Sequence, residues 1–146
     1  MIKRLLIYSV IIFSFTNCTT DKFEKIPEDR FIGIWELRGR PMFEGIKILI
    51  EKNDNDELIG KIVELNNNKY VRLFADSADI WISNIKRVSN YQFRLTEKKI
   101  AKELFSLYGL NTSTEFKIEF IDNNTFGLAT GNSDPSKSDI FYKRLE

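Results

Sequence analysis

The chain has 146 residues and a globular composition, which fits one folded domain, and its 22 basic and 21 acidic residues leave no charge excess that would point to nucleic acid as a partner. It has no histidine and one cysteine, Cys18. This excludes Ser-His-Asp and Cys-His nucleophile sites, His- or Cys-held zinc and internal disulfides. We therefore expect a protein that is not an enzyme and has no metal or cofactor, with an enzyme that uses carboxylate-only, Ser-Lys or Tyr-based chemistry as the remaining alternative.

The first 17 residues have the parts of a secretory signal. Lys3 and Arg4 give a positive start, and an apolar run of 11 residues follows over 5–15. Such a run has the length found in signal peptides and is shorter than the roughly 20 residues that span a bilayer. The sequence therefore predicts a signal peptide over 1–17.

The end of this segment, Phe15-Thr16-Asn17-Cys18, resembles the lipobox of bacterial lipoproteins. In that family the cysteine sulfur receives a diacylglycerol, and cleavage makes the cysteine the new N-terminus. The resemblance implies that Cys18 carries the acyl chains (palmitate or similar) that hold the protein on a membrane. Thr19, where inner-membrane lipoproteins tend to have aspartate, favours the outer membrane of a Gram-negative cell envelope. An uncleaved membrane anchor and ordinary secretion are the alternatives.

We expect residues 18–30 to be a flexible tether that begins at the lipidated cysteine. The stretch after Cys18 is polar, has mixed charges and Pro27, and shows no clear period. Extended residues span at most about 3.3–3.6 Å each, so such a tether reaches about 40 Å. We expect the folded domain to occupy 31–146.

From Phe31 onward, apolar and polar residues alternate with a period of two, as in 46–50 and 116–120, which is typical of half-buried antiparallel strands. Runs rich in Asn and Asp separate the strands and favour tight turns. We expect an all-β, up-and-down antiparallel barrel of about eight strands. The candidate strands lie near 31–38, 44–52, 57–65, 69–74, 80–88, 91–96, 115–122, 125–130 and 139–145.

One segment, TEKKIAKELFSLYG, breaks this alternation and predicts a short helix over 97–108, packed over a mouth or face of the barrel. Thr96 is the candidate cap at its start and Gly109 at its end. One helical face is apolar and another carries three lysines, read as a solvated side, with a helix lying on a membrane surface as the alternative. The apolar face holds Ile100, Leu104, Leu107 and Tyr108.

The two ends of the domain resemble lipocalins and related calycins. The first strand contains Gly33-x-Trp35, and the last strand supplies Arg144. The resemblance implies a lipocalin-like barrel in which Trp35 plugs the closed end and Arg144 lies across its ring, with Lys143 and Arg38 as substitutes. A guanidinium over an indole also ties the first strand to the last.

An eight-stranded barrel is either filled by its own side chains or holds one small ligand. As candidates to line a ligand pocket we take Tyr70, Trp81, Phe93, Phe120 and Tyr142, and the alternative is that such aromatics form the core. Two functions follow. One is a membrane-anchored lipoprotein that binds a small apolar or amphipathic ligand. The other is a cell-envelope interaction protein, an assembly subunit or inhibitor that uses the outer surface of the barrel.

Overall fold

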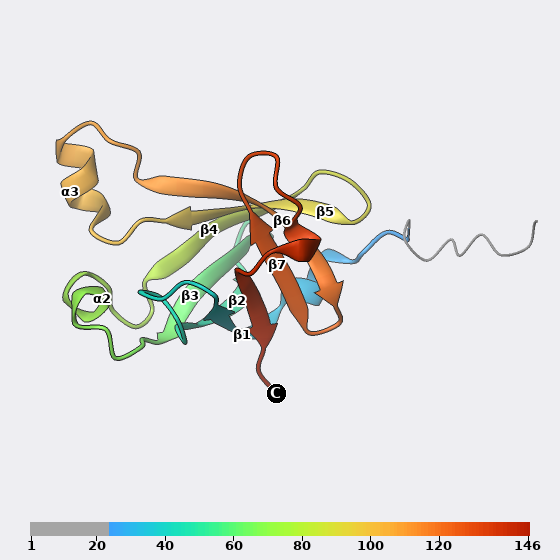
Figure 1. Cartoon of the computed structure of the whole chain (residues 1–146), viewed down its shortest axis with the longest axis horizontal. Coiled ribbons are helices and arrows are strands. Elements are labelled where there is room, and N and C mark those ends of the chain that lie inside the picture. Colours follow the sequence, from blue (N-terminus) through green and yellow to red (C-terminus); the bar gives the residue numbers. More distant parts are fainter. Residues whose placement is uncertain (1–23) are drawn as a thin grey trace, which may run out of the picture.

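The computed structural model describes residues 24–146, so the predicted signal peptide and Cys18 lie outside the described residues. Eight strands form one closed antiparallel barrel in sequence order, with β8 pairing back to β1 (Figure 1). The predicted all-β, up-and-down barrel is confirmed. The strands are β1 (Gly33–Arg38), β2 (Lys47–Lys52), β3 (Leu58–Glu64), β4 (Ile80–Arg87), β5 (Gln92–Lys98), β6 (Ser113–Asp122), β7 (Thr125–Ala129) and β8 (Phe141–Arg144).

On β1, β2 and β5 every second side chain points into the barrel and is buried, or nearly so. On β1 these are Trp35 and Leu37, and on β5 they are Phe93 and Leu95, all at most 1% exposed. The described core lies within residues 31–142, and a closed barrel has no free edge. The closed barrel encloses this core, and we therefore take residues 24–146 as the domain for experiments in solution.

Trp35 and Arg144 lie together at the closed end of the barrel. They are partners in the β1–β8 register, and the guanidinium carbon of Arg144 lies 4.2 Å from the centroid of the Trp35 ring. Arg144 also donates to the carbonyl oxygen of Ile32 at 2.9 Å and to that of Arg30. Gly33 has a φ of +139°, and a Cβ there would lie 2.4 Å from Nη1 of Arg144. Glycine is thus required where the guanidinium approaches the backbone.

The chain before β1 covers this closed end. It contains the short 3-10 helix η3 (Glu28–Phe31), whose Phe31 is fully buried and packs on Phe93 with ring centroids 4.8 Å apart. The backbone N–H of Ile26 donates to the carbonyl of Asn90 at 2.9 Å. The last residues of the predicted tether are therefore packed against the barrel.

The segment 69–74, predicted as a strand, is a helix, α2 (Lys69–Phe74), so the prediction was wrong there. The side-chain oxygen of Asn68 accepts from the backbone N–H groups of Tyr70 and Val71, which satisfies donors that a helix start leaves free. Only Val71 of this helix is buried. A short helix with one buried residue has no repeating pattern of apolar side chains, so the sequence contains no helical periodicity to detect.

The predicted helix over 97–108 is present but begins later, as α3 (Lys102–Leu107). Residues 97 and 98 belong to β5, which stays paired with β6 as far as Lys98 and Ser113. Ala101, with a φ of +55°, then turns the chain from strand into helix, so Thr96 is not the cap. A further 3-10 helix, η4 (Pro135–Lys137), precedes β8.

We predict that Arg144→Met destabilises the domain by about 2–4 kcal/mol, because it removes charge-assisted hydrogen bonds and a cation–π contact together. The free energy of unfolding in urea measures the loss. Lys143→Met on the outer face of β8 is the matched control and should change stability by no more than about 0.5 kcal/mol. Equal effects of the two substitutions would contradict the structural role of Arg144.

Candidate functional site

The open end of the barrel carries all of its long connections. Because the strands alternate in direction, the connections 39–46, 65–79, 99–112 and 130–140 lie at one end, and three tight turns lie at the other. The helices α2 and α3 both project from this open end (Figure 1). Loops at the mouth of a barrel are where binding residues gather.

Glu97 is the one charged or polar residue among residues 24–146 that is buried, with 2% exposure. It follows Phe93 and Leu95 on the inward face of β5, at the end of the strand nearest the mouth. Its Oε1 accepts a hydrogen bond of 2.6 Å from the hydroxyl of Tyr142, and its Oε2 pairs with the guanidinium of Arg40. A carboxylate is thus held inside the barrel by two donors.

Tyr142 links this carboxylate to Trp81. The indole Nε1–H of Trp81 donates to the hydroxyl oxygen of Tyr142 at 2.9 Å, and that hydroxyl donates in turn to Glu97. Burial, and then the charge of Glu97, raise the pKa of Tyr142 well above its ordinary value of about 10. The hydroxyl therefore stays protonated and serves as a donor. No buried side-chain N or O atom in residues 24–146 lacks a partner.

The loop 39–46 between β1 and β2 covers this network. Arg40 reaches inward from it, and its guanidinium carbon lies 4.6 Å from the ring centroid of Phe43. Phe43 in turn meets Trp81 edge to face, with ring centroids 5.4 Å apart. One loop thus contributes both the cation that neutralises Glu97 and an aromatic cover for Trp81.

A cleft of about 410 Å³ opens beside Trp81 at the mouth. Its walls come from the end of α2 and the start of β4 on one side, and from the end of β5 and the start of α3 on the other. Apolar side chains, among them Ile62, Phe74 and Trp81, contribute to its lining. Three lysines also line it, namely Lys98, Lys99 and Lys102.

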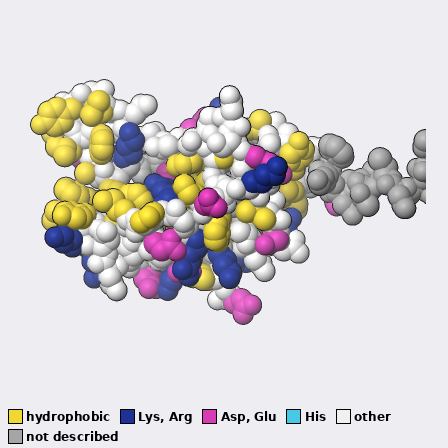
Figure 2. All heavy atoms as spheres, viewed as in Figure 1, with side chains coloured by type: hydrophobic (Ala, Val, Ile, Leu, Met, Phe, Trp, Pro, Cys, Tyr) yellow, Lys and Arg dark blue, Asp and Glu magenta, His cyan; other side chains and the backbone are white. Residues whose placement is uncertain are grey.

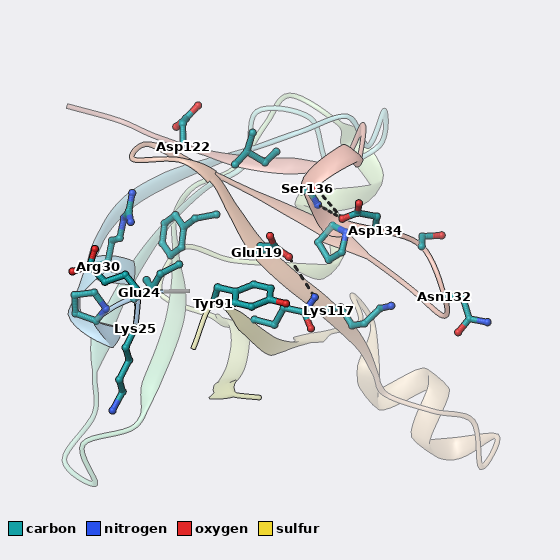
Figure 3. A pocket seen from close by; sticks show the side chains of 17 residues that line it. Glu24, Lys25, Arg30, Tyr91, Lys117, Glu119, Asp122, Asn132, Asp134 and Ser136 are labelled. Carbon is teal, nitrogen blue, oxygen red and sulfur yellow. Dashed lines mark hydrogen bonds between the residues drawn. The ribbon is translucent and has the colours of Figure 1, made fainter. Parts of the chain in front are cut away.

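A larger cleft, of about 1110 Å³, lies on the outside of the barrel near the closed end (Figure 3). Its lining contains positively and negatively charged side chains, for example Lys117 and Glu119 from the outer face of β6. Tyr91, from the turn before β5, also lines it. Glu119 accepts from the side-chain amide of Gln92 at 3.4 Å. We take the mouth as the candidate site because a buried polar network lies at that end, whereas no buried polar or charged residue of the described chain lines the outer cleft.

The five aromatic residues predicted to line a ligand pocket do not form one site. Trp81 and Tyr142 meet in the mouth network. Phe93 is core near the closed end, and Phe120 packs on Phe31 there and lines the outer cleft. Tyr70 lies on α2 outside the barrel and is half exposed.

Sequence reasoning missed Glu97, Arg40 and Phe43. Glu97 lies two positions after Leu95, which lies two positions after Phe93, so strand alternation would have predicted that all three side chains point inward. It was hidden because the following residues fit a helix. Arg40 and Phe43 lie in a loop, where no periodicity indicates which side chains turn inward.

Within 24–146, no cluster of three or more acidic residues could hold a metal ion, and no helix has both the length and the apolar character needed to cross a membrane. Comparisons of the chain with protein-family models, with curated proteins and with solved structures gave no match.

We predict that Tyr142→Phe destabilises the domain by about 1–3 kcal/mol at pH 7, because Glu97 and Trp81 each lose a buried partner. A raised folded-state pKa means that the stabilisation from neutral Tyr142 is complete below about pH 10 and is lost as the pH rises from there through the folded pKa. The variant should therefore show a smaller alkaline loss of stability. Urea unfolding at pH 7 and near pH 11 measures both effects.

Tyr108→Phe, at an exposed tyrosine, is the matched control and should change neither quantity. A Tyr142→Phe domain with the stability and alkaline profile of the unmodified one would show that the network contributes nothing.

Proposed function

We propose that this protein is a membrane-anchored lipoprotein whose lipocalin-like barrel binds a small amphipathic ligand at its open end. The observation that carries the proposal is the mouth cleft, whose lining brings apolar side chains such as Phe74 and Trp81 together with three lysines. Its volume of about 410 Å³ falls in the range of small-molecule sites. The absence of histidine and of a second cysteine supports binding rather than catalysis.

The ligand would lie at the mouth rather than in the middle of the barrel. The inner rings pack closely on one another, with centroids 4.7 Å apart for Trp35 and Phe126 and 5.1 Å apart for Phe126 and Tyr142. Above them, Trp81 belongs both to the cleft and to the buried network. A chain resting on Trp81 would therefore lie on a rigid floor, because the indole is fixed by Tyr142.

The lysines that line the mouth cleft indicate that the ligand carries a negative charge. Lys98, Lys99 and Lys102 contribute three positive charges to the lining, against Asp79 and Glu103. An apolar tail in the cleft would leave an anionic head group near these ammonium groups, in partly desolvated surroundings where the attraction is stronger than in water. The proposed ligand class is a small anionic amphiphile, such as a fatty-acid-like carboxylate.

We predict that dodecanoate, titrated into the 24–146 domain, gives a saturable change in tryptophan fluorescence. Changing Lys98 and Lys99 together to glutamine should weaken binding by about tenfold, which corresponds to about 1.4 kcal/mol. Lys86→Gln, on the outer face of β4, is the matched control and should bind as the unmodified domain does.

Dodecyltrimethylammonium, which has the same tail and the opposite charge, should bind more weakly. Equal binding of the two amphiphiles would contradict the anionic class. No saturable response to either would favour the alternative, a filled barrel that acts through its outer surface.

The anchor is the second part of the proposal, and Cys18 is its lipidation site. Its support is the order of positive start, apolar run and cysteine at the beginning of the chain, which lies outside the described residues. A diacylglycerol supplies two chains, and two chains are what stable attachment takes. The proposed location is the outer membrane of a Gram-negative cell, reached by way of the periplasm.

We predict that Cys18→Ser, in the full chain expressed in a Gram-negative host, abolishes acylation and moves the protein out of the membrane fraction. Mass spectrometry of the N-terminal peptide and cell fractionation measure these effects. Asn17→Gly keeps the cysteine and makes the junction more like a lipobox, so it should stay acylated. A Cys18→Ser protein that is processed and membrane-bound as before would overturn the lipidation.

A further inference from the structure

The two helices at the open end expose large apolar side chains to solvent. On α2, Leu73 is 70% exposed, and at α3, Leu107 and Tyr108 are 83% and 75% exposed. Figure 2 shows two groups of apolar side chains in yellow at the end of the molecule where Figure 1 places α2 and α3. At least half of the surface is exposed for the whole set of Tyr70, Leu73, Phe74, Leu104, Leu107, Tyr108 and Leu110, which we name the tip surface.

The tip surface has no role in the core. No residue of α3 is buried, and Val71 is the one buried residue of α2. Single exposed leucines are ordinary on proteins, but seven large apolar residues exposed on and just after two short projecting helices are the kind of surface that marks an interaction. The cost of exposing them to water is recovered when something apolar covers them.

The charges around the tip surface indicate what covers it. The segments 69–79 and 98–110 contain five basic and three acidic residues, whereas the other described residues contain 14 basic and 17 acidic ones. The two segments that carry the tip surface are therefore net positive, although residues 24–146 together contain 19 basic and 20 acidic residues. Two of its lysines lie against aromatic rings, Lys69 at 4.9 Å from the centroid of Tyr70 and Lys99 at 5.0 Å from that of Phe105.

We propose that the tip surface docks onto the surface of an anionic lipid bilayer. Leu73 and Leu107 would enter the boundary between head groups and acyl chains, and the neighbouring lysines would contact lipid phosphates. Apolar tips surrounded by lysine are the pattern of interfacial membrane binding, and aromatic residues such as Tyr70 and Tyr108 are favoured at that depth.

A protein partner fits this surface less well. Protein–protein interfaces are depleted in lysine and present one continuous patch, whereas here four of the five basic residues are lysines and the apolar groups form two separate prongs. Lysine suits a bilayer because its long stem lies along apolar groups while its ammonium stays with the head groups.

The docking surface is distinct from the proposed lipid anchor. The first described residues lie at the closed end of the barrel, opposite α2 and α3 (Figure 1). Docking also does not depend on the ligand proposal, since Leu73 and Leu107 do not line the mouth cleft. A failure of the docking proposal would therefore leave the ligand proposal standing, and the reverse also holds.

The test is sedimentation of the 24–146 domain with vesicles of phosphatidylglycerol and phosphatidylcholine in equal amounts. We expect binding that falls as salt is added and that is much weaker on pure phosphatidylcholine. Leu73→Glu combined with Leu107→Glu should reduce binding by about tenfold or more, because it places charges where acyl chains would be. Both sites are exposed, so cooperative urea unfolding should be retained.

Val88→Glu is the matched control. Val88 is 55% exposed in the turn between β4 and β5, at the opposite end, so this variant should bind vesicles as the unmodified domain does. Equal loss in both variants, or no binding to anionic vesicles, would overturn the proposal. A concentration-dependent dimer in sedimentation equilibrium, lost in the tip variant, together with absent vesicle binding, would assign the surface to a second copy instead.

Discussion

The pairing of β1 with β8 is the constraint on which the rest of the structure depends. Without it the first and last strands would each leave a row of unpaired backbone groups at an edge. Closure also fixes which side chains face inward, because residues alternate along each strand and a barrel has one inside. On β8 this parity turns both Tyr142 and Arg144 inward, the first toward the mouth network and the second toward Trp35. One strand of four residues thus serves both ends of the barrel.

At the mouth, the same parity places a carboxylate where an apolar residue would cost less. A buried ion pair such as Glu97 with Arg40 is weak evidence for stability, since desolvation offsets most of the attraction. What the pair supplies is position. It draws loop 39–46 over the barrel and sets Phe43 against Trp81. The buried pair thus fixes how the loop covers the mouth, and its desolvation is the cost of that position.

The sequence predicted those parts of the fold that depend on alternation and on turn residues. The strands around 46–50 and 116–120 alternate plainly, and Gly33-x-Trp35 with Arg144 indicated the closed end. Segment 69–74 was misread because a helix with one buried residue, Val71, has too weak a pattern to distinguish from a strand. Glu97 was assigned to a helix. Its partners Tyr142 and Arg40 lie 45 and 57 residues away along the chain, so no local pattern indicated that Glu97 is buried with them. Periodicity describes neighbours along the chain, and this site is made of residues that closure brings together.

The open end therefore unites three features: a covered carboxylate, a cleft lined in part by three lysines, and the tip surface. They share elements, because the cleft lies between the end of α2 and the start of α3, and those helices carry the exposed leucines. If the tip surface rests on a bilayer, the cleft opens at the depth of the head groups. An anionic amphiphile could then pass from the bilayer to Trp81 without exposing its tail to water, which is the largest barrier to its transfer. Docking would in that case set the rate of ligand uptake, while Trp81 and the lysines set its affinity.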